Sequence, residues 1–265
     1  MDLIHILVLA VVQGLTEFLP VSSSAHLILA PVLLGWQDQG LTFDVALHLG
    51  SLIAIVGYFR HDIVNMARAW LLSLFERRLT PDGKLAWAVL LGTIPVGLAG
   101  LLLNDFIATH LRSPFILAAT MVGFGLLLGW ADWRPNAQRT VADMTWRDVL
   151  WIALAQAVAL IPGTSRSGIT MTAGLLVGLS RHAAARFSFL LAIPVIVLAS
   201  LLQLQEAATS PQAIDWTALW IGVVASAIST YLCIALFLRF IQRVGMMPFV
   251  LYRIFLGALL LWVYA

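Results

Sequence analysis

The chain has 265 residues, of which 61% are hydrophobic and only 11% are charged. Water-soluble domains contain about 45–50% apolar and about 25% charged residues, so the composition excludes a soluble globular protein. The net charge is +2 and the basic residues are scattered, which argues against a nucleic-acid partner. The single cysteine, Cys233, excludes an internal disulfide. The composition therefore predicts an integral membrane protein surrounded by lipid.

The first half of the chain contains one interrupted apolar stretch and three long apolar runs. Residues 1–35 are apolar but are broken by the polar, turn-forming sequence PVSSSAH at 20–26. A helix needs about 20 apolar residues to cross about 30 Å of hydrocarbon, and helices satisfy their own backbone groups in lipid. The runs 41–59, 85–103 and 114–131 meet this length approximately. They are predicted to be membrane-spanning helices.

The second half of the chain repeats this order of elements. Residues 149–180 are broken by the sequence PGTSRSG at 162–168, and three further apolar runs follow. These runs are 187–203, 217–238 and 248–265. The predicted fold class is therefore an all-α polytopic membrane protein, folded as one membrane domain over 1–265.

Basic residues predict the sidedness of the connections, because Lys and Arg are enriched in cytoplasmic loops. Segment 104–113 contains only Arg112 and segment 204–216 contains no basic residue, whereas four other connections contain several. We assign the basic connections to the cytoplasm, so residues 149–180 must enter and leave on one face. That stretch is a re-entrant hairpin or, as the alternative, two short spans. The basic connections are 60–84, 132–148, 181–186 and 239–243.

Each half is thus predicted to contain one re-entrant helical hairpin and three transmembrane helices. Repeat one covers about 1–131 and repeat two about 149–265, and their hairpins enter from opposite faces. Broken helices that meet near the midplane of an inverted-topology repeat typically form the binding site. Aligning the two breaks pairs Pro20 with Pro162, Ser22 with Thr164 and Ser23 with Ser165.

Glu17 and Gln13 lie four residues apart at the end of the first apolar segment. This spacing puts both side chains on one helix face, and a carboxylate with an amide oxygen suits Mg²⁺ or Ca²⁺. Ionisable groups at membrane depth are costly and are usually functional. We therefore expect a divalent cation at Gln13 and Glu17. The alternative is that Glu17 only hydrogen-bonds a neighbouring helix.

Serines 22–24 precede the second arm of the first hairpin, where serine favours the N-cap of a helix. Capping alone is one interpretation of Ser22, Ser23 and Ser24. His26 lies three residues after Ser23, so both side chains can face the same way. This short polar window makes Ser23 and His26 candidates for chemistry together with Glu17.

Arg166 is a guanidinium in the middle of an apolar stretch and needs an anionic partner, such as a phosphate or a carboxylate. Its neighbours are typical of an anion-binding turn at a helix start. The alternative is a structural salt bridge between Arg166 and Glu17. The neighbours are Gly163, Thr164, Ser165, Ser167 and Gly168.

Other polar residues in the apolar segments receive structural interpretations. Asp44 and His48 share a helix face near the outer end of a span; a polar helix cap is the preferred interpretation, and a contact of either residue with the site is the alternative. Arg253 is expected to snorkel or to form a structural pair. A phosphate site inside an apolar fold suggests a lipid phosphate, and these features do not distinguish hydrolysis of that lipid from its transport.

These motifs resemble the undecaprenyl-pyrophosphate phosphatase, or bacitracin-resistance protein, family. The two longest are QGLTEFLPVSSSAH at 13–26 and PGTSRSG at 162–168, and shorter matches are distributed along the chain. The resemblance covers essentially the whole sequence. The shorter matches are LHLG at 47–50, SR at 180–181, AARFS at 184–188, PF at 248–249 and YR at 252–253.

The resemblance implies a plasma-membrane enzyme that hydrolyses undecaprenyl pyrophosphate to the monophosphate and inorganic phosphate. It also implies recycling of this carrier lipid for peptidoglycan synthesis, bacitracin resistance, a divalent-cation requirement and a site that opens to the extracytoplasmic face. The first position of the paired acidic motif is Glu or Gln in the family and is Gln13 here, which leaves Glu17 as the acid–base group of the pair.

The roles expected from this resemblance follow the logic of phosphoryl transfer, in which positioning and charge neutralisation dominate. Ser23 is the expected nucleophile with help from Glu17 or His26, and attack by water or by His26 is the rival mechanism. Arg166 is the expected phosphate clamp. A polyprenyl-phosphate transporter with the same site is the alternative function, and a homodimer is left open. The expected phosphate donors are Ser22, Ser24, Gly163, Thr164, Ser165, Ser167 and Thr170.

Overall fold

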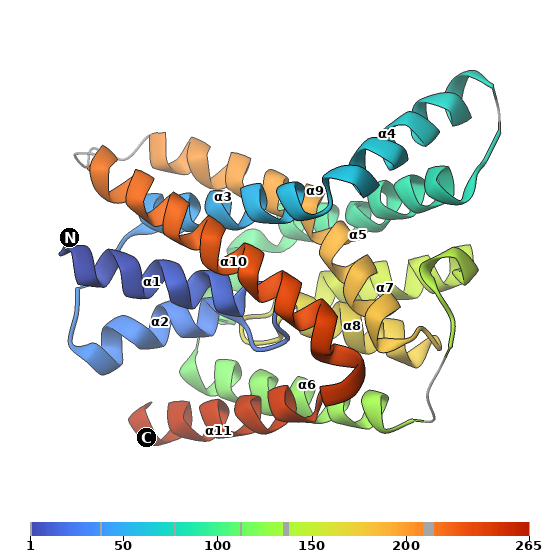
Figure 1. Cartoon of the computed structure of the whole chain (residues 1–265). Helices are drawn as coiled ribbons and strands as arrows, with labels where there is room; N and C mark the ends of the chain where they lie inside the picture. Colours follow the sequence, from blue (N-terminus) through green and yellow to red (C-terminus); the bar gives the residue numbers. More distant parts are fainter. Residues whose placement is uncertain are drawn as a thin grey trace.

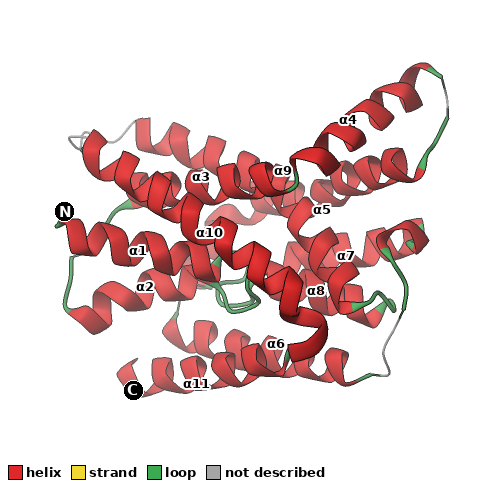
Figure 2. Cartoon of the chain, viewed as in Figure 1, coloured by secondary structure: helices red, strands yellow, loops and turns green. Residues whose placement is uncertain are grey.

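The computed structural model describes residues 2–37, 39–76, 78–111, 113–134, 138–208 and 215–264. These residues form eleven α-helices and one short 3₁₀ helix, joined by short loops (Figures 1 and 2). Their bounds are α1 (Leu3–Thr16), α2 (Ser23–Leu34), α3 (Leu41–Tyr58), α4 (Arg60–Phe75), α5 (Pro81–His110), α6 (Pro114–Trp133), η1 (Val141–Asp143), α7 (Trp146–Val158), α8 (Arg166–Leu176), α9 (Arg181–Ala208), α10 (Trp216–Val244) and α11 (Met247–Tyr264).

Six of these helices are long and apolar enough to cross a membrane. They correspond one to one with the six predicted runs, so the prediction of an all-α polytopic membrane protein is confirmed. The six segments are Leu41–Tyr58, Pro81–Leu103, Pro114–Trp133, Arg181–Gln203, Trp216–Val244 and Met247–Tyr264. Arg112 and residues 209–214, which belong to the two connections predicted to be outside, are not among the described residues.

Helix α4 was not predicted, because residues 60–84 were interpreted only by their basic charge. Ile63, Met66 and Trp70 recur at the three- and four-residue spacing of an amphipathic helix. Met66 is buried, and α4 packs against α5. An ion pair between Asp62 and Arg186 connects α4 to α9.

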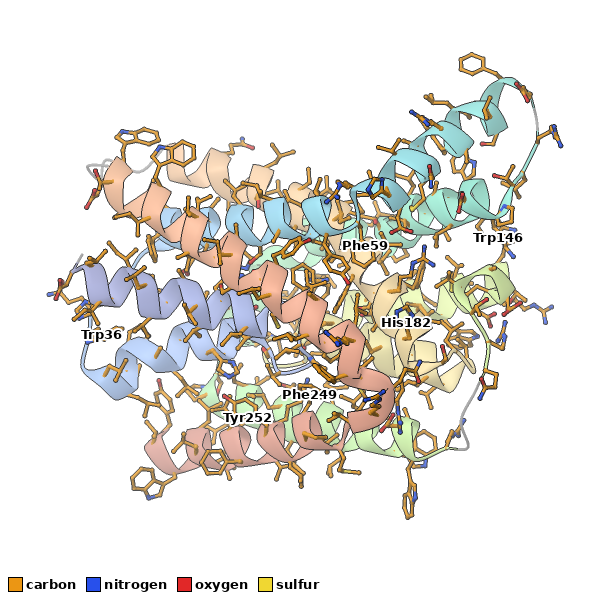
Figure 3. All side chains as sticks on the ribbon, in the orientation of Figure 1. Trp36, Phe59, Trp146, His182, Phe249 and Tyr252 are labelled. Atoms are coloured by element: carbon orange, nitrogen blue, oxygen red, sulfur yellow. The ribbon has the colours of Figure 1, made fainter. Side chains whose placement is uncertain are left out.

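The two interrupted stretches fold as two pairs of short helices, as the breaks in the sequence predict. Helices α1 and α2 are joined by residues 17–22, and α7 and α8 by residues 159–165. Figure 1 shows the two pairs at opposite ends of the molecule, with both connections near its centre. The rings of His5 on α1 and Trp36, just after α2, stack with centroids 3.9 Å apart. Trp36 lies at the end of this pair that is far from the centre of the molecule (Figure 3).

The residues before α2 and α8 share an unusual backbone conformation. Ser22 has φ 73° and Ser165 has φ 68°, and no other described non-glycine residue has a positive φ. Each of these serines is the N-cap of its helix. The sequence alignment, which paired Ser22 with Thr164, is therefore wrong by one residue here. The cause is the second connection, which is one residue longer than the first.

The long helices pack around these two pairs in a reciprocal way. Helix α1 packs against α10, and α7 packs against α5. The contact with α10 is close because both α1 and α3 present a glycine to it. A Cβ added to Gly14 of α1 would lie 2.8 Å from the Thr230 backbone nitrogen. A Cβ added to Gly50 of α3 would lie 2.4 Å from the Val223 carbonyl oxygen. Small residues at helix crossings are the usual means of close packing in membranes.

The connections that follow α4, α6, α8 and α10 lie at one end of the molecule, and the N-terminus and the α2–α3 connection lie at the other (Figure 1). Many of the described basic residues in loops or at helix ends lie at the first end, including Arg78, Arg139 and Arg147. This charge distribution gives the fold a basic end and an end with few basic residues. The centre of the molecule lies between them, where the two helix pairs meet.

Candidate functional site

Three of the four residues singled out for chemistry lie at helix ends next to the two central connections. Glu17 directly follows α1, Ser23 begins α2, and Arg166 begins α8. Phe18 fixes the first connection, because its ring is fully buried and meets the Phe189 ring edge-on at 5.2 Å. The broken helices therefore bring residues that are far apart in the chain to one place.

The Glu17 carboxylate is the centre of this cluster. Arg166 Nη2 donates to Glu17 Oε1 at 2.7 Å, and the Ser23 hydroxyl donates to Glu17 Oε2 at 2.7 Å. Glu17 is buried, with 9% of its surface exposed. The salt bridge that was the alternative interpretation of Arg166 is thus present. Its two partners are also the expected base, Glu17, and the expected phosphate clamp, Arg166, and the expected nucleophile, Ser23, is hydrogen-bonded to the same carboxylate.

Gln13 and His48 complete the surroundings of Glu17. Gln13 Nε2 donates to Glu17 Oε2 at 3.1 Å, which confirms that the two side chains share one helix face. His48 Nε2 lies 3.6 Å from Glu17 Oε2, and His48 Nδ1 hydrogen-bonds the Asp44 carbonyl oxygen at 2.8 Å. The alternative interpretation, in which His48 reaches the site, is therefore the correct one, because α3 packs so that its imidazole faces the carboxylate.

Two cavities open beside Glu17 and Arg166. The first has a volume of about 160 Å³ and is predominantly polar. The second has a volume of about 170 Å³ and extends between α5, α9 and the start of the second connection as far as Gln203. His48 lines both cavities. The first is lined by Glu17, Ser22, Ser23, Ser24, His48, Ala159, Gly163, Ser165 and Arg166.

The second connection forms a turn rich in hydrogen-bond donors. Ser165 caps α8 by accepting from the Gly168 N–H at 3.2 Å, and the Ser167 hydroxyl donates to the Leu19 carbonyl oxygen at 2.8 Å. Gly163 has φ +85°, and a Cβ there would lie 2.5 Å from the Leu117 carbonyl oxygen, so glycine is required. Ser167 therefore links this turn to the first one.

The remaining predicted phosphate donors lie in different environments. Thr164 is fully buried, and its hydroxyl has no hydrogen-bond partner among the described residues. Thr170 donates to the Arg166 carbonyl oxygen at 2.8 Å, lies 2.7 Å from the Ser188 hydroxyl and does not line the first cavity. Ser24 is exposed, and its hydroxyl lies 3.2 Å from that of Ser22.

His26 faces away from the Glu17 cluster. Its Nδ1 hydrogen-bonds the Ser22 carbonyl oxygen at 2.7 Å, and its Nε2 hydrogen-bonds the hydroxyl of Tyr252 on α11 at 2.6 Å (Figure 3). The two rings also stack with an interplanar angle of 5°. Both imidazole nitrogens are thus engaged, and His26 lines neither cavity.

Arg253 is a central residue whose role the sequence did not predict. It is fully buried, and its guanidinium donates to the carbonyl oxygens of Pro20, Gly163 and Thr164 at 3.3, 3.0 and 2.9 Å. It also donates to the carbonyl oxygens of Thr120 and Met121. Of the two predicted roles, snorkelling is wrong, because the bundle encloses the side chain completely. The structural pairing is present, but with backbone carbonyl oxygens rather than with a charged side chain. An arginine inside an apolar span was the signal for a buried role.

The charges around the two connections favour an anion. Glu17 and Arg166 neutralise each other, and the hydrogen bonds of Arg253 go to neutral carbonyl oxygens, so one positive charge is left over. The first turns of α2 and α8 add free backbone N–H groups and the positive ends of two helix dipoles. A ligand with two phosphates suits this surplus of positive charge and donors.

The residues beside Glu17 were tested for their fit to a divalent cation bound together with such a ligand. No group of three or more His, Cys, Asp or Glu side chains suited to a metal occurs in the described part of the chain. The buried Gln13 Oε1, however, has no hydrogen-bond partner among the described residues and lies on the residue that contacts Glu17. Mg²⁺ commonly uses one or two carboxylates and completes its shell with water and substrate phosphates, so these residues fit a cation bound with its substrate.

Comparison with known proteins agrees with the motifs. The model of the family "bacitracin resistance protein BacA" matches residues 6–259. The chain is 61% identical over 264 residues to undecaprenyl-diphosphatase 2 of Stutzerimonas stutzeri, covering 98% of each chain. It is 58% identical to the undecaprenyl-diphosphatase of Nitrosococcus oceani and 56% to that of Thioalkalivibrio sulfidiphilus, each covering 100% of both chains. With a match over nearly its whole length, the chain belongs to the bacitracin resistance protein BacA family.

Proposed function

We propose that the chain is an undecaprenyl-diphosphatase, a membrane hydrolase that releases inorganic phosphate from undecaprenyl diphosphate and leaves undecaprenyl phosphate. Three relatives at 56–61% identity over essentially the full length carry this name. The observation that carries the proposal is the Ser23–Glu17–Arg166 cluster, in which a hydroxyl, a carboxylate and a guanidinium meet within hydrogen-bonding distance. The product is the carrier lipid reused in peptidoglycan synthesis, and its faster recycling would raise bacitracin resistance.

Ser23 is the proposed nucleophile. Its hydroxyl donates to Glu17 Oε2 at 2.7 Å, so Glu17 can accept the proton as the oxygen attacks. A bond forms between Ser23 Oγ and the terminal phosphorus, the bridging P–O bond breaks, and undecaprenyl phosphate leaves. Water then attacks the phosphoserine, releases inorganic phosphate and restores the hydroxyl.

Attack by water is the main rival, and in it Glu17 activates the water directly. A role for His26 as nucleophile or as acid–base group is less well supported, because both its ring nitrogens have partners away from Glu17. His26 would have to release the Tyr252 hydroxyl to take part. The serine mechanism needs no such rearrangement.

Arg166 is the proposed phosphate clamp. Its Nη1 is buried and has no hydrogen-bond partner among the described residues, whereas its Nη2 is held by Glu17. A phosphate in the first cavity would offer the missing acceptor and bring charge-assisted hydrogen bonds. The proposed donors around it are Ser22, Ser24, Gly163 and Ser165, which line this cavity. Thr164, Ser167 and Thr170, also expected from the sequence, do not line it.

A divalent cation, Mg²⁺ or Ca²⁺, is proposed to bind at Gln13 and Glu17 together with the diphosphate. When bound, the cation would offset the negative charge of the phosphates. The support for it is the unpartnered Gln13 Oε1 beside the Glu17 carboxylate.

The proposed architecture is an inverted repeat in the plasma membrane, with α1–α2 and α7–α8 as re-entrant hairpins. The reciprocal packing of α1 on α10 and α7 on α5 supports this interpretation, as do the two N-cap serines with positive φ. The basic end of the molecule supports a cytoplasmic assignment for that end. The second cavity leads from Glu17 to Gln203, near the end of α9 with few basic residues, which supports a site that opens outward.

A transporter of polyprenyl phosphate is the second candidate function. Two opposed helix pairs whose connections meet near the centre are a common transporter design (Figure 1). Vesicles that contain the purified protein separate the two functions. Movement of the lipid across the bilayer without phosphate release would favour transport.

Phosphate release from undecaprenyl diphosphate by the purified, detergent-solubilised protein tests the enzyme proposal. We expect release that a chelator abolishes and that is lost in Glu17→Ala and Arg166→Ala. The matched controls are Glu76→Ala and Arg68→Ala, which alter exposed side chains of the α4 region and should retain activity. Near-normal phosphate release by folded Arg166→Ala would overturn the proposed site. No phosphate release by the well-folded wild type would overturn the proposal that the protein is a phosphatase.

A further inference from the structure

His48 lies next to the Glu17 carboxylate and has no role in the proposed mechanism. It belongs to α3, lines both cavities and has 28% of its side-chain surface exposed, so an occupant of either cavity can reach it. Its Nε2 atom lies 3.6 Å from Glu17 Oε2. The imidazole is therefore placed to share a ligand with the carboxylate.

The other ring nitrogen of His48 determines what Nε2 can bind. Nδ1 lies 2.8 Å from the Asp44 carbonyl oxygen, and because a carbonyl oxygen only accepts, Nδ1 carries the hydrogen of this bond. In the neutral imidazole, Nε2 then has no hydrogen and presents a lone pair to Glu17 Oε2. Two acceptors at this separation repel each other unless a proton or a metal ion lies between them.

Both features are typical of a histidine that binds a metal. Such a histidine nearly always donates its second N–H to a carboxylate, a backbone carbonyl oxygen or water, which fixes the ring. Two atoms that bind one ion at about 2.1 Å each lie about 3.0–3.4 Å apart, so His48 Nε2 and Glu17 Oε2 need to move only a few tenths of an ångström. Gln13 Oε1, which is buried and has no hydrogen-bond partner among the described residues, is available as a third ligand atom.

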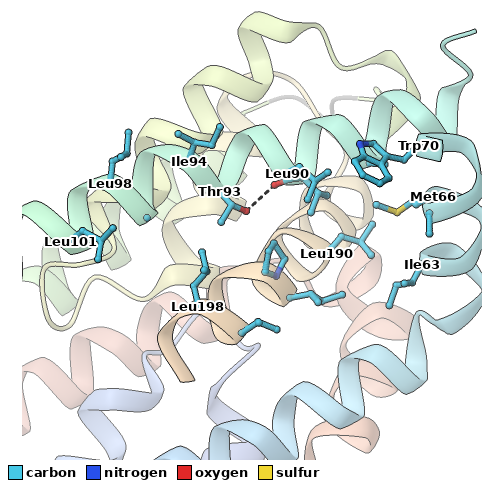
Figure 4. Close-up of a pocket in the computed structure, with 17 residues that line it drawn as sticks. Ile63, Met66, Trp70, Leu90, Thr93, Ile94, Leu98, Leu101, Leu190 and Leu198 are labelled. Atoms are coloured by element: carbon cyan, nitrogen blue, oxygen red, sulfur yellow. Dashed lines mark hydrogen bonds between the residues drawn. The ribbon is translucent and has the colours of Figure 1, made fainter. Parts of the chain in front are cut away.

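A larger apolar groove offers no comparable set of ligands. It lies between α4, α5 and α9 and has a volume of about 830 Å³ (Figure 4). Its lining is mainly aliphatic and aromatic, and the Thr93 hydroxyl in its wall donates to the Val89 carbonyl oxygen at 2.8 Å. The groove shares no described lining residue with the two cavities at Glu17. An ion at the site therefore depends on the residues of the two smaller cavities.

We propose that His48 Nε2 is the third protein ligand, beside Gln13 and Glu17, of the divalent cation that binds with the diphosphate, an inference that rests on the proposed function. An imidazole nitrogen suits first-row transition-metal ions, whereas Ca²⁺ takes oxygen ligands. His48 therefore shifts the preference of the site away from Ca²⁺ and towards ions such as Mn²⁺ and Zn²⁺. The negative diphosphate offsets the charge that the ion adds beside Arg166.

The first experiment detects the nitrogen ligand directly. Mn²⁺ is added to the full-length protein in detergent with methylenediphosphonate, a diphosphate analogue that resists hydrolysis, and electron spin-echo envelope modulation is recorded. We expect a ¹⁴N modulation that changes to the ¹⁵N pattern when the protein contains ¹⁵N-labelled histidine. The modulation should disappear in His48→Gln and remain in His61→Gln, the matched control with an exposed imidazole on α4.

The second experiment measures the affinity for each ion in the presence of methylenediphosphonate. Removing only the outer partner of a metal-binding histidine typically weakens metal binding by about 10–100-fold, so the Mn²⁺ affinity of His48→Gln should fall at least about tenfold. The Ca²⁺ affinity should change much less, because glutamine offers Ca²⁺ an oxygen. His48→Asn is a second variant with the same expectation, His61→Gln should bind both ions like the wild type, and thermal unfolding without metal identifies any variant that does not fold.

The outcomes separate this ligand from the proposed function. A wild-type Mn²⁺ spectrum without nitrogen modulation, a modulation that persists in His48→Gln, or equal Mn²⁺ affinities of the two proteins would overturn the ligand. The phosphatase would still stand if the wild type releases phosphate from undecaprenyl diphosphate. An imidazolium–carboxylate pair of His48 with Glu17 would give the first of these results. Nitrogen modulation from His48 in a protein that releases no phosphate would instead overturn the phosphatase and leave the metal site standing.

Discussion

Glu17 and Arg166 form an ion pair across the two halves of the chain, with 2.7 Å between Oε1 and Nη2. Both side chains are largely buried: 8% of the Glu17 side-chain surface and 13% of that of Arg166 are exposed. The pair holds the carboxylate beside Ser23 and leaves Nη1 of the arginine free for a phosphate. In the proposed function, Nη1 would bind a phosphate while Nη2 stays with Glu17.

Removing one member of this pair should affect stability as well as turnover. Arg166→Ala leaves a buried carboxylate without its cation, which typically costs about 3–5 kcal/mol, and should lower the thermal unfolding midpoint in detergent. The double variant Glu17→Ala/Arg166→Ala removes both charges and should recover part of that midpoint while turnover stays lost. A double-mutant cycle of unfolding and phosphate release measures both effects. Additive midpoints would show that the two side chains do not stabilise each other.

Ser23→Ala should lower kcat by about 10³-fold or more, as loss of a nucleophile does elsewhere. Ser24→Ala should raise KM several-fold with a smaller change in kcat, because Ser24 lines the cavity but its recorded hydroxyl contact is with Ser22 rather than Glu17. Acid quenching of the wild type during turnover should trap a phosphoserine at position 23, detected by mass spectrometry. Substantial turnover in Ser23→Ala would favour direct attack by water.

Arg253→Met should destabilise the protein by about 3–5 kcal/mol. The change removes a cation that donates to five backbone carbonyl oxygens from both connections and from α6. Arg253→Lys keeps the charge but has fewer hydrogen-bond donors, so its stability should lie between those of the wild type and Arg253→Met. The readout is thermal unfolding, with Arg239→Met as the exposed control on α10. An Arg253→Met midpoint equal to that of the control would remove Arg253 from the account of how the connections are held.

Gly14→Ala should destabilise the contact of α1 with α10. An added Cβ would lie 2.8 Å from the Thr230 backbone nitrogen and 2.9 Å from the Ser226 carbonyl oxygen, so one helix must shift. Such overpacking costs about 1–3 kcal/mol. Gly57→Ala on α3, where a Cβ meets nothing within 4 Å, should be neutral or slightly stabilising. Unfolding midpoints of the two variants in the same detergent check the difference.

Much of the site could be predicted because its residues are of types that are unusual within an apolar stretch. Glu17 and Arg166 are ionisable groups in apolar stretches, and the prolines, glycines and serines around them break a helix wherever it lies. Such signals are contained in a few consecutive residues. They sufficed to name Gln13, Glu17, Ser23 and Arg166, which the structure brings together.

Other features depend on which segments meet, and no short stretch of sequence carries that information. His48 resembles a helix cap until α3 turns it towards Glu17, and His26 resembles a partner of Ser23 until α11 supplies Tyr252. The pairing of Ser22 with Ser165 required the backbone conformation, because the two connections differ in length by one residue.

The sequence by itself determined that this protein is surrounded by lipid, that it has six long apolar helices, and where the two interrupted stretches break into short helices. Composition, run length and turn residues act locally, so they have the same consequence in any packing of the helices. Only the tertiary structure decided that Arg253 holds both connections and that α4, α5 and α9 enclose an apolar groove. These are relationships between segments far apart in the chain, and close packing of helices in three dimensions creates them.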